Sequence, residues 1–172
     1  GVNSCGDGTL ASLPITVIPP VVLTITDPAN ICAGGTTDIT VPIITAGSDT
    51  TNITLSYWTD AAATATLVNP TAVSAGTYYI KATNANNCFT IKPVVVTEQA
   101  LPTVTVNPAT ICADGTATIT ATPSSGTFSY AWITIPATAI NPGNTASFTT
   151  AIAGDYTVEI TDMVAPNCTS LP

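Results

Sequence analysis

The stretch that decides the fold is DPANICAGGTTDIT at residues 27–40, which returns as NPATICADGTATIT at residues 107–120. Cys32 and Cys112 occupy the same place in the two copies, and the offset between them is 80 residues (112 − 32). Composition alone does not explain a return this close. The sequence therefore indicates a tandem repeat with a period of about 80 residues.

Each copy of the repeat carries a second cysteine at a fixed distance. Cys88 follows Cys32 by 56 residues (88 − 32), and Cys168 follows Cys112 by 56 residues (168 − 112). A module of about 80 residues buries only a modest core, so a covalent staple is a reasonable supplement. We therefore expect one disulfide in each module, Cys32–Cys88 and Cys112–Cys168.

Cys5 has no partner in this pairing. It follows Asn3 and Ser4, much as Cys88 and Cys168 follow asparagines, so it has the phase of a module's second cysteine. We expect its partner to lie upstream of residue 1. The alternative is a free reactive thiol, which would need an activating base that no neighbouring residue supplies.

Composition limits the classes of function. The 172 residues carry a formal net charge of −8, no histidine and only two basic residues, Lys81 and Lys92. Because no basic patch can neutralise phosphates, nucleic acid binding and docking on an anionic membrane are both disfavoured. No apolar run reaches the roughly 18 residues that a membrane span requires. Paired cysteines predict an oxidising compartment, and we expect an extracellular or cell-surface protein.

The fold class follows from the residue types and from the frequent prolines and glycines that break the chain into short segments. Threonine, valine and isoleucine are abundant, and these β-branched residues suit pleated sheets. Fourteen prolines and eleven glycines interrupt the chain, and no window shows a sustained helical period. We therefore predict an all-β protein, with strands at residues 21–26, 36–41, 53–58, 65–68, 77–83 and 89–96, and in the second copy at residues 103–106, 116–121, 127–132, 146–150 and 155–161.

The repeat also predicts the domain boundaries. Residues 20–100 form the first module, and residues 101–172 form the second module without its last strand. Residues 1–19 are expected to be the final strand of a preceding module, or a donor strand, because LPITV at residues 13–17 resembles KPVVV at residues 92–96. Each would enter its strand through a proline, which a first or edge position tolerates.

Four aromatic residues recur at matching places. Trp58 and Trp132 fall in the third predicted strand of each module, and Tyr78 and Tyr156 begin the penultimate one. A buried tryptophan, a corner tyrosine and a cysteine pair are typical of an immunoglobulin-like β-sandwich. We expect all four side chains in the core. The alternative is sugar stacking, which needs exposed aromatic rings; further candidates for it are Tyr57, Tyr130, Tyr79, Phe89 and Phe148.

These motifs together resemble a known family. The patterns Pro-Ala-x-Ile-Cys-Ala-x-Gly-Thr, Ser-Tyr-(x)-Trp, Ala-Gly-x-Tyr and Asn-Cys are similar to the Ig-like and PKD-like tandem repeats of giant Bacteroidota surface proteins. Those proteins are exported by the type IX system and include gliding-motility adhesins. The resemblance covers nearly the whole chain and implies a filamentous cell-surface protein with no catalytic residues. Residues 162–168 depart from it by a turn that is longer by two residues.

Sites of chemistry are sparse in the sequence. We expect no enzyme and no cofactor, because no carboxylate pair has a nearby histidine, lysine or nucleophile elbow. Ten scattered acids make calcium between modules the one metal to consider, with Asp7 and Glu98 near the junctions. Candidate glycosylation residues are Thr50, in an Asp-Thr-Thr pattern that resembles Bacteroidota O-glycosylation sites, and Asn52, in an N-linked acceptor pattern.

The sequence therefore predicts a structural or adhesive repeat segment of a long extracellular filament or adhesin stalk. Its partners would be neighbouring Ig-like modules, and surface glycans or other cells. Two alternatives stay open. One is a subunit of a pilus-like polymer in which residues 5–18 complete the next copy by donor-strand exchange. The other is a carbohydrate-binding module.

Overall fold

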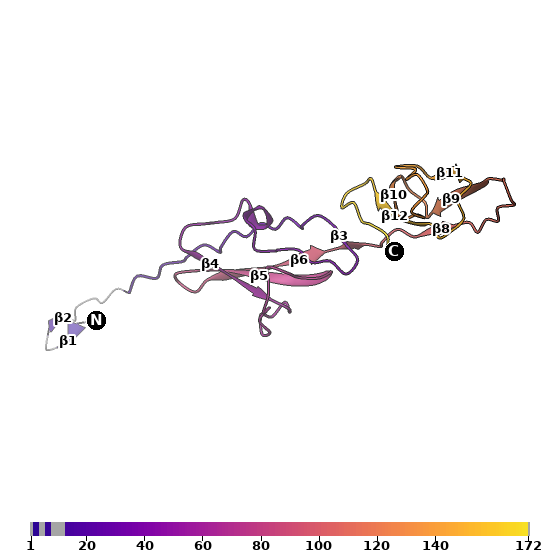
Figure 1. Ribbon diagram of the computed structural model, residues 1–172. Helices are drawn as coiled ribbons and strands as arrows, with labels where there is room; N and C mark the ends of the chain where they lie inside the picture. Colours follow the sequence, from indigo (N-terminus) through magenta and orange to yellow (C-terminus); the bar gives the residue numbers. More distant parts are fainter. Residues whose placement is uncertain (1, 4–5, 8–12, 172) are drawn as a thin grey trace.

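The structure, a computed structural model, describes residues 2–3, 6–7 and 13–171 (Figure 1). Within these residues the fold is all-β, and the one helical segment is the 3-10 turn η1 at Pro42–Thr45. The sequence-based prediction of an all-β class is confirmed. The short strands β1 (Val2–Asn3) and β2 (Gly6–Asp7) pair with each other antiparallel.

The N-terminal core region, residues 21–96, is built on one antiparallel sheet. Strands β4 (Ile53–Trp58), β5 (Gly76–Asn84) and β6 (Phe89–Val96) pair in the order β4-β5-β6. Alternate residues of these strands face a single hydrophobic cluster, as the two-residue period of a strand requires. Its buried members are Val21, Leu23, Ile31, Ile39, Ile44, Val73, Ile80, Ala82, Val94 and Val96.

The other side of this core is covered by irregular chain, where strands were predicted at residues 21–26 and 36–41. Those two predictions are wrong. Val22 donates its backbone N–H to the Asp49 carboxylate at 2.8 Å, and Thr24 donates to the Ser48 hydroxyl at 2.8 Å. Side-chain oxygens thus occupy places that ladder carbonyls would fill in a strand. The strand predicted at residues 65–68 is reduced to an isolated bridge between Trp58 and Thr66.

The C-terminal core region, residues 104–162, contains two small sheets. One pairs β10 (Phe128–Thr134) with β12 (Thr157–Asp162), and the other has the order β11 (Ser147–Thr150), β9 (Ala117–Pro123), β8 (Val104–Val106). All five strands predicted here are confirmed with small shifts at their ends. Side chains from both sheets meet in one cluster, which is consistent with a β-sandwich. The buried members are Ile119, Ala121, Trp132 and Val158.

A short parallel pairing joins the two regions. Strand β3 (Ile31–Cys32) runs beside β7 (Glu98–Gln99), with Cys32 opposite Gln99. Gln99 also donates from its side-chain amide to the Asp162 carboxylate of the C-terminal region at 2.8 Å. In Figure 1, β3 lies between the sheet β4-β5-β6 and the C-terminal region. The two regions are therefore joined by hydrogen bonds at the junction as well as by the connecting peptide.

The disulfide lies at this junction, between Cys32 and Cys168, and the expected pairs Cys32–Cys88 and Cys112–Cys168 are wrong. Cys88 precedes β6, whereas Cys32 pairs with β7 beyond the other end of β6. The eight residues of β6 span roughly 26 Å at about 3.3 Å per residue. A disulfide needs Cα atoms within about 7 Å, so Cys88 cannot reach Cys32. Cys5 lies outside the described residues.

Candidate functional site

The Cys32–Cys168 disulfide is a covalent bond between the N-terminal and C-terminal regions. Its Cα atoms are 5.5 Å apart, within the usual range. Cys168 is 1% exposed, and Cys32 is half-buried. The sequence separation is 136 residues, which is one repeat of 80 longer than the expected interval of 56. The staple therefore connects the first cysteine of one repeat to the second cysteine of the following repeat.

The first half of the staple is a tight turn that the repeated ICAxG motif specifies. Gly35 donates its N–H to the carbonyl of Cys32 at 2.8 Å, and a Cβ added at Gly35 would come within 2.9 Å of that oxygen. The residue before it, Gly34, has φ +79°, in the left-handed region. Only glycine fits the last position without a clash, which explains why the motif ends as it does.

The second half of the staple is the hairpin after β12. Asp162 donates its N–H to the carbonyl of Cys168 at 2.8 Å, and Asn167 precedes the cysteine with φ +61°. The Asn167 side-chain amide donates to the carbonyl of Asp162 at 2.9 Å. An asparagine before the cysteine is thus a conformational requirement of the turn, because asparagine tolerates the left-handed region.

Both corner tyrosines are half-buried, and each forms a hydrogen bond to an upstream carbonyl. Tyr78 donates its hydroxyl to the carbonyl of Ser74 at 3.2 Å, and Tyr156 donates to the carbonyl of Ile152 at 2.9 Å. Each bond reaches back four residues, which is the pattern of a tyrosine corner in immunoglobulin-like folds. Tyr78 packs against the core of the N-terminal region and Tyr156 against that of the C-terminal region.

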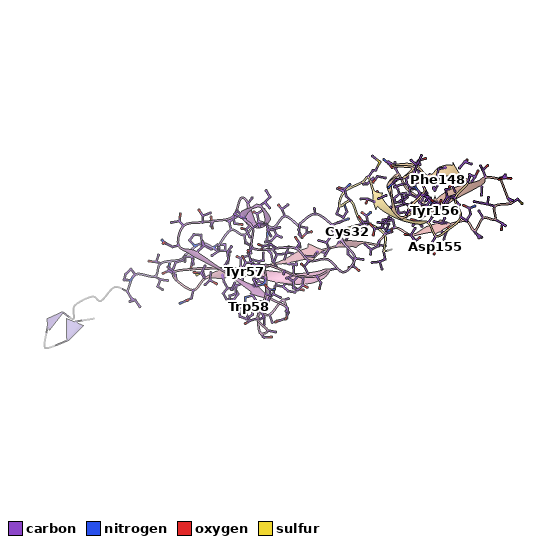
Figure 2. All side chains as sticks on the ribbon, viewed as in Figure 1. Cys32, Tyr57, Trp58, Phe148, Asp155 and Tyr156 are labelled. Atoms are coloured by element: carbon purple, nitrogen blue, oxygen red, sulfur yellow. A yellow bond between two sulfur atoms is a disulfide. The ribbon has the colours of Figure 1, made fainter. Side chains whose placement is uncertain are left out.

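The two tryptophans differ. Trp132 is 4% exposed and donates from Nε1 to the carbonyl of Thr145 at 3.0 Å, so its predicted core role is confirmed. Its ring meets Phe148 edge-on at 4.9 Å, and Figure 2 shows Phe148 close to Tyr156. Trp58 is only half-buried and is not part of the N-terminal cluster, so its predicted core role is wrong.

A single residue explains the difference. Trp132 lies two positions after Tyr130, but Trp58 follows Tyr57 directly (Figure 2). Because side chains alternate across a strand, Trp132 shares the inner face with Tyr130, whereas Trp58 takes the face opposite to Tyr57. Tyr57 packs against the core instead.

Trp58 therefore belongs to the outer face of the sheet β4-β5-β6. The register places it beside Tyr79, and Tyr79 beside Pro93. Lys81 lies on the same face, with Nζ 4.1 Å from the centre of the Phe89 ring. Of the aromatic residues considered for sugar stacking, Trp132 is removed by burial. Trp58 and Tyr79 are neighbours on this outer face, and Phe89 lies further along it, opposite Thr83.

The candidate glycosylation residues lie at the other end of the N-terminal region. Thr50 and Asn52 are both exposed, and Asn52 has φ +55° in the turn that leads into β4. Thr50 lines a hollow together with Pro19 and Asn84. The geometry leaves both side chains accessible to a modifying enzyme, and modification itself remains a prediction.

Two of the acidic side chains, Asp60 and Asp38, accept hydrogen bonds from backbone N–H groups. Asp60 accepts from the N–H groups of Ala62, Thr64 and Ala65, and the bond from Ala65 is the main reason why the pKa of Asp60 is lowered. Hydrogen bonds from Thr40 lower the pKa of Asp38 in the same way. Among the residues that the structure describes, no group of three or more acidic, histidine or cysteine side chains is placed to hold a metal ion. Glu98 lies in β7 at the junction, and the Asp7 side chain is outside the described part.

Comparisons with known proteins give no relative from which a role could be transferred. The chain matches no protein-family model and no curated protein. In the described part of the chain, no helix has the length and apolar character needed to cross a membrane. Function must therefore be argued from the junction, the outer face and the ends of the two regions.

Proposed function

We propose that this chain is a structural repeat segment of a long extracellular filament or adhesin stalk, built from Ig-like β-sandwich modules joined end to end. The observation that carries the proposal is the Cys32–Cys168 disulfide across the junction. The two regions are connected by the peptide between β7 and β8 and, in addition, by this second covalent link. Two connections restrict bending and twisting far more than one, which suits a load-bearing stalk.

The chemistry of the staple also supports the location. Disulfides form and persist in oxidising compartments and are rare in the cytosol. The bonded Cys168 is nearly inaccessible to solvent and Cys32 is half-buried, which limits the access of reducing agents to one side of the bond. An extracellular site of action is the expectation that follows.

The experiment is immunogold electron microscopy of intact cells of the source organism, with antibodies raised against this chain. We expect gold particles in rows along surface fibres. Labelling confined to the cytoplasm of sectioned cells would overturn the proposal. Pre-absorbing the antibody with the purified chain is the control for specificity.

A second candidate, a polymer of separate subunits, is favoured by two complementary features. Residues 13–18 have no strand pairing, and the side chains of Leu13, Ile15 and Val17 are 86%, 86% and 87% exposed. Beside β12, the described chain after it forms a single bridge, from Thr169 to Thr161, and backbone bonds between Cys168 and Asp162 and between Ser170 and Ile160.

The N-terminal region shows what such an edge accepts. There β6 pairs along the whole of β5 and buries Val94 and Val96. In an exchanged polymer, Ile15 and Val17 of another copy would take the places of these two valines. A denaturing gel of native fibres under reducing conditions separates the candidates, because subunit-sized bands support the polymer and very high mass supports the covalent array.

A further inference from the structure

The staple joins successive repeats, and each repeat holds both of its halves. The first half is the ICAxG turn, and the second is the Asn-Cys hairpin. In this chain the turn of the first repeat and the hairpin of the second are bonded to each other. The hairpin of the first repeat and the turn of the second repeat are therefore not joined to a partner by a disulfide. Their cysteines, Cys88 and Cys112, are free thiols.

Cys112 has the backbone of a staple turn. Gly115 donates its N–H to the carbonyl of Cys112 at 2.9 Å, as Gly35 does to Cys32. A Cβ added at Gly115 would come within 3.1 Å of that carbonyl, and Asp114 has φ +62° where Gly34 has φ +79°. The thiol-bearing residue is exposed. The turn is thus formed and accessible without its partner.

Cys88 has the backbone of a staple hairpin. Asn84 donates its N–H to the carbonyl of Cys88 at 2.9 Å, as Asp162 does to Cys168 at 2.8 Å. Asn87 precedes it with φ +62°, close to the value at Asn167. Cys88 is half-buried, whereas the bonded Cys168 is fully buried. Part of the Cys88 surface is therefore available to a partner.

The two free cysteines lie at opposite ends of the pair of regions. Asn84, next to the Cys88 hairpin, lines a hollow with Ile18 and Pro19, where the chain enters the N-terminal region. Cys112 lies in the connection from β8 to β9, which in Figure 1 is at the end of the C-terminal region remote from β4. Each thiol is at the outer end of the pair of regions, where a further repeat would begin.

We propose that Cys112 and Cys88 are the unbonded halves of this staple. Cys112 of one copy forms a disulfide with Cys88 of a second copy, which takes the place of the following repeat. The proposal rests on the stalk function above. In the reaction two thiols lose two protons and two electrons and one S–S bond forms. A disulfide oxidant, such as oxidised glutathione, accepts the electrons and is reduced to two thiols.

The second copy is the fitting occupant because its other features match the internal junction. At that junction β6 fills the edge of β5 and leads through β7 into the next region. Residues 13–18 lead in the same way into the N-terminal region of their own copy and carry the matching LPITV sequence. A copy placed on the outer end would thus bring its unpaired segment to β12 and its Cys88 to Cys112.

The test uses the whole chain with Cys5→Ser as background, so that the cysteine outside the described part takes no role. Two further variants are made from it, Cys88→Ser and Cys112→Ser. Each is incubated alone, and then both are mixed, in a glutathione buffer of fixed redox ratio. Non-reducing gels follow the dimer, and mass spectrometry of its peptides identifies the linked cysteines.

We expect the mixture to form a Cys112–Cys88 dimer at least tenfold faster than either variant alone, and the background chain to form a ladder that reducing agent removes. Equal dimerisation of each variant alone would show random thiol pairing and overturn the proposal, as would no dimer in any sample. Electron microscopy of a variant that lacks Cys5, Cys88 and Cys112 separates the two claims. If its fibres form while the mixture does not cross-link, the disulfide is refuted and the stalk function stands.

Discussion

The two core regions share a sequence motif and a tyrosine corner, yet they differ in how completely their cores are closed. The N-terminal cluster contains ten buried residues and the C-terminal cluster four, among the residues that the structure describes. Part of the difference comes from β6, which brings Val94 and Val96 to the first core. Beside β12 the described chain supplies the shorter segment Cys168, Thr169 and Ser170 in place of a full strand.

The regions also differ in how they are covered. The first is covered by irregular segments that carry Val21, Leu23, Ile39 and Ile44, whereas the second has two paired sheets. One repeated sequence thus supports two different coverings around the same tyrosine corner. The comparison shows that the repeat preserves the turns and the staple more strictly than it preserves the strands between them.

The largest expected effect separates the two tryptophans. Trp132→Ala removes a buried ring from the smaller core and should cost about 3 to 5 kcal/mol of unfolding free energy. Trp58→Ala removes a half-buried ring from the outer face and should cost about 1 kcal/mol or less. Urea unfolding followed by far-ultraviolet circular dichroism measures both. Equal losses would contradict the alternation argument.

The second largest effect on stability is expected from removing the Cys32–Cys168 disulfide. The double variant Cys32→Ser, Cys168→Ser opens a loop of 136 residues and should lower the free energy of unfolding by about 2 to 5 kcal/mol. It should also broaden the distance distribution between spin labels placed one in each region. The matched control is Cys88→Ser, Cys112→Ser, which should change stability by less than about 0.5 kcal/mol. An unchanged distance distribution would argue against a clamped junction.

A smaller effect compares the two tyrosine corners. Tyr156 has a hydrogen bond of 2.9 Å to Ile152 and a second contact of 3.0 Å with the Thr150 hydroxyl, whereas Tyr78 has one bond of 3.2 Å. Tyr156→Phe should therefore cost about 1 to 1.5 kcal/mol, and Tyr78→Phe about 0.5 kcal/mol. Thermal unfolding by calorimetry ranks the variants, and the reverse ranking would show that these distances do not report bond strength.

The smallest effect concerns Asp60. Its pKa in the folded chain lies below the usual carboxyl value, chiefly because Ala65 donates its N–H to the carboxylate. The contribution to stability is therefore complete above the unfolded pKa and is lost as pH falls through the folded pKa. The Ala65 amide resonance should shift with a midpoint below pH 3.8. Asp60→Asn should abolish that titration, and a midpoint above 3.8 would contradict the assignment.

Sequence reasoning found the strands of the C-terminal region because the repeat predicts them in the same order as those of the first module. It failed at residues 21–26 because the hydrogen-bond acceptors there are Ser48 and Asp49, distant residues whose roles no local pattern reveals. It failed at Trp58 because one residue fewer after Tyr57 reverses the face, a difference that was visible in the two strings Ser-Tyr-Trp and Ser-Tyr-Ala-Trp.

The disulfide error has a more general reason. In a tandem repeat, equal cysteine intervals arise whether the bond lies within a module or between neighbours, because moving one partner by a full period keeps both intervals equal. Strand direction distinguishes the two cases. The hairpin cysteine precedes the last strand of a module, and the turn cysteine lies beyond the other end of that strand. Cys32 and Cys88 are separated in this way.

Under the proposed function of an extracellular stalk, the double connection at the junction has a consequence for the survival of the fibre. Extracellular proteases cut exposed connections between folded units, and residues 100–103 form the connection between β7 and β8, in which Ala100 and Thr103 are exposed and Pro102 is buried. A cut there would not release the outer region, since the Cys32–Cys168 bond still holds both halves. A nicked fibre would keep its full length until a reductant reached the buried sulfur. Protease damage would therefore stay hidden at every stapled junction and appear only under reducing conditions.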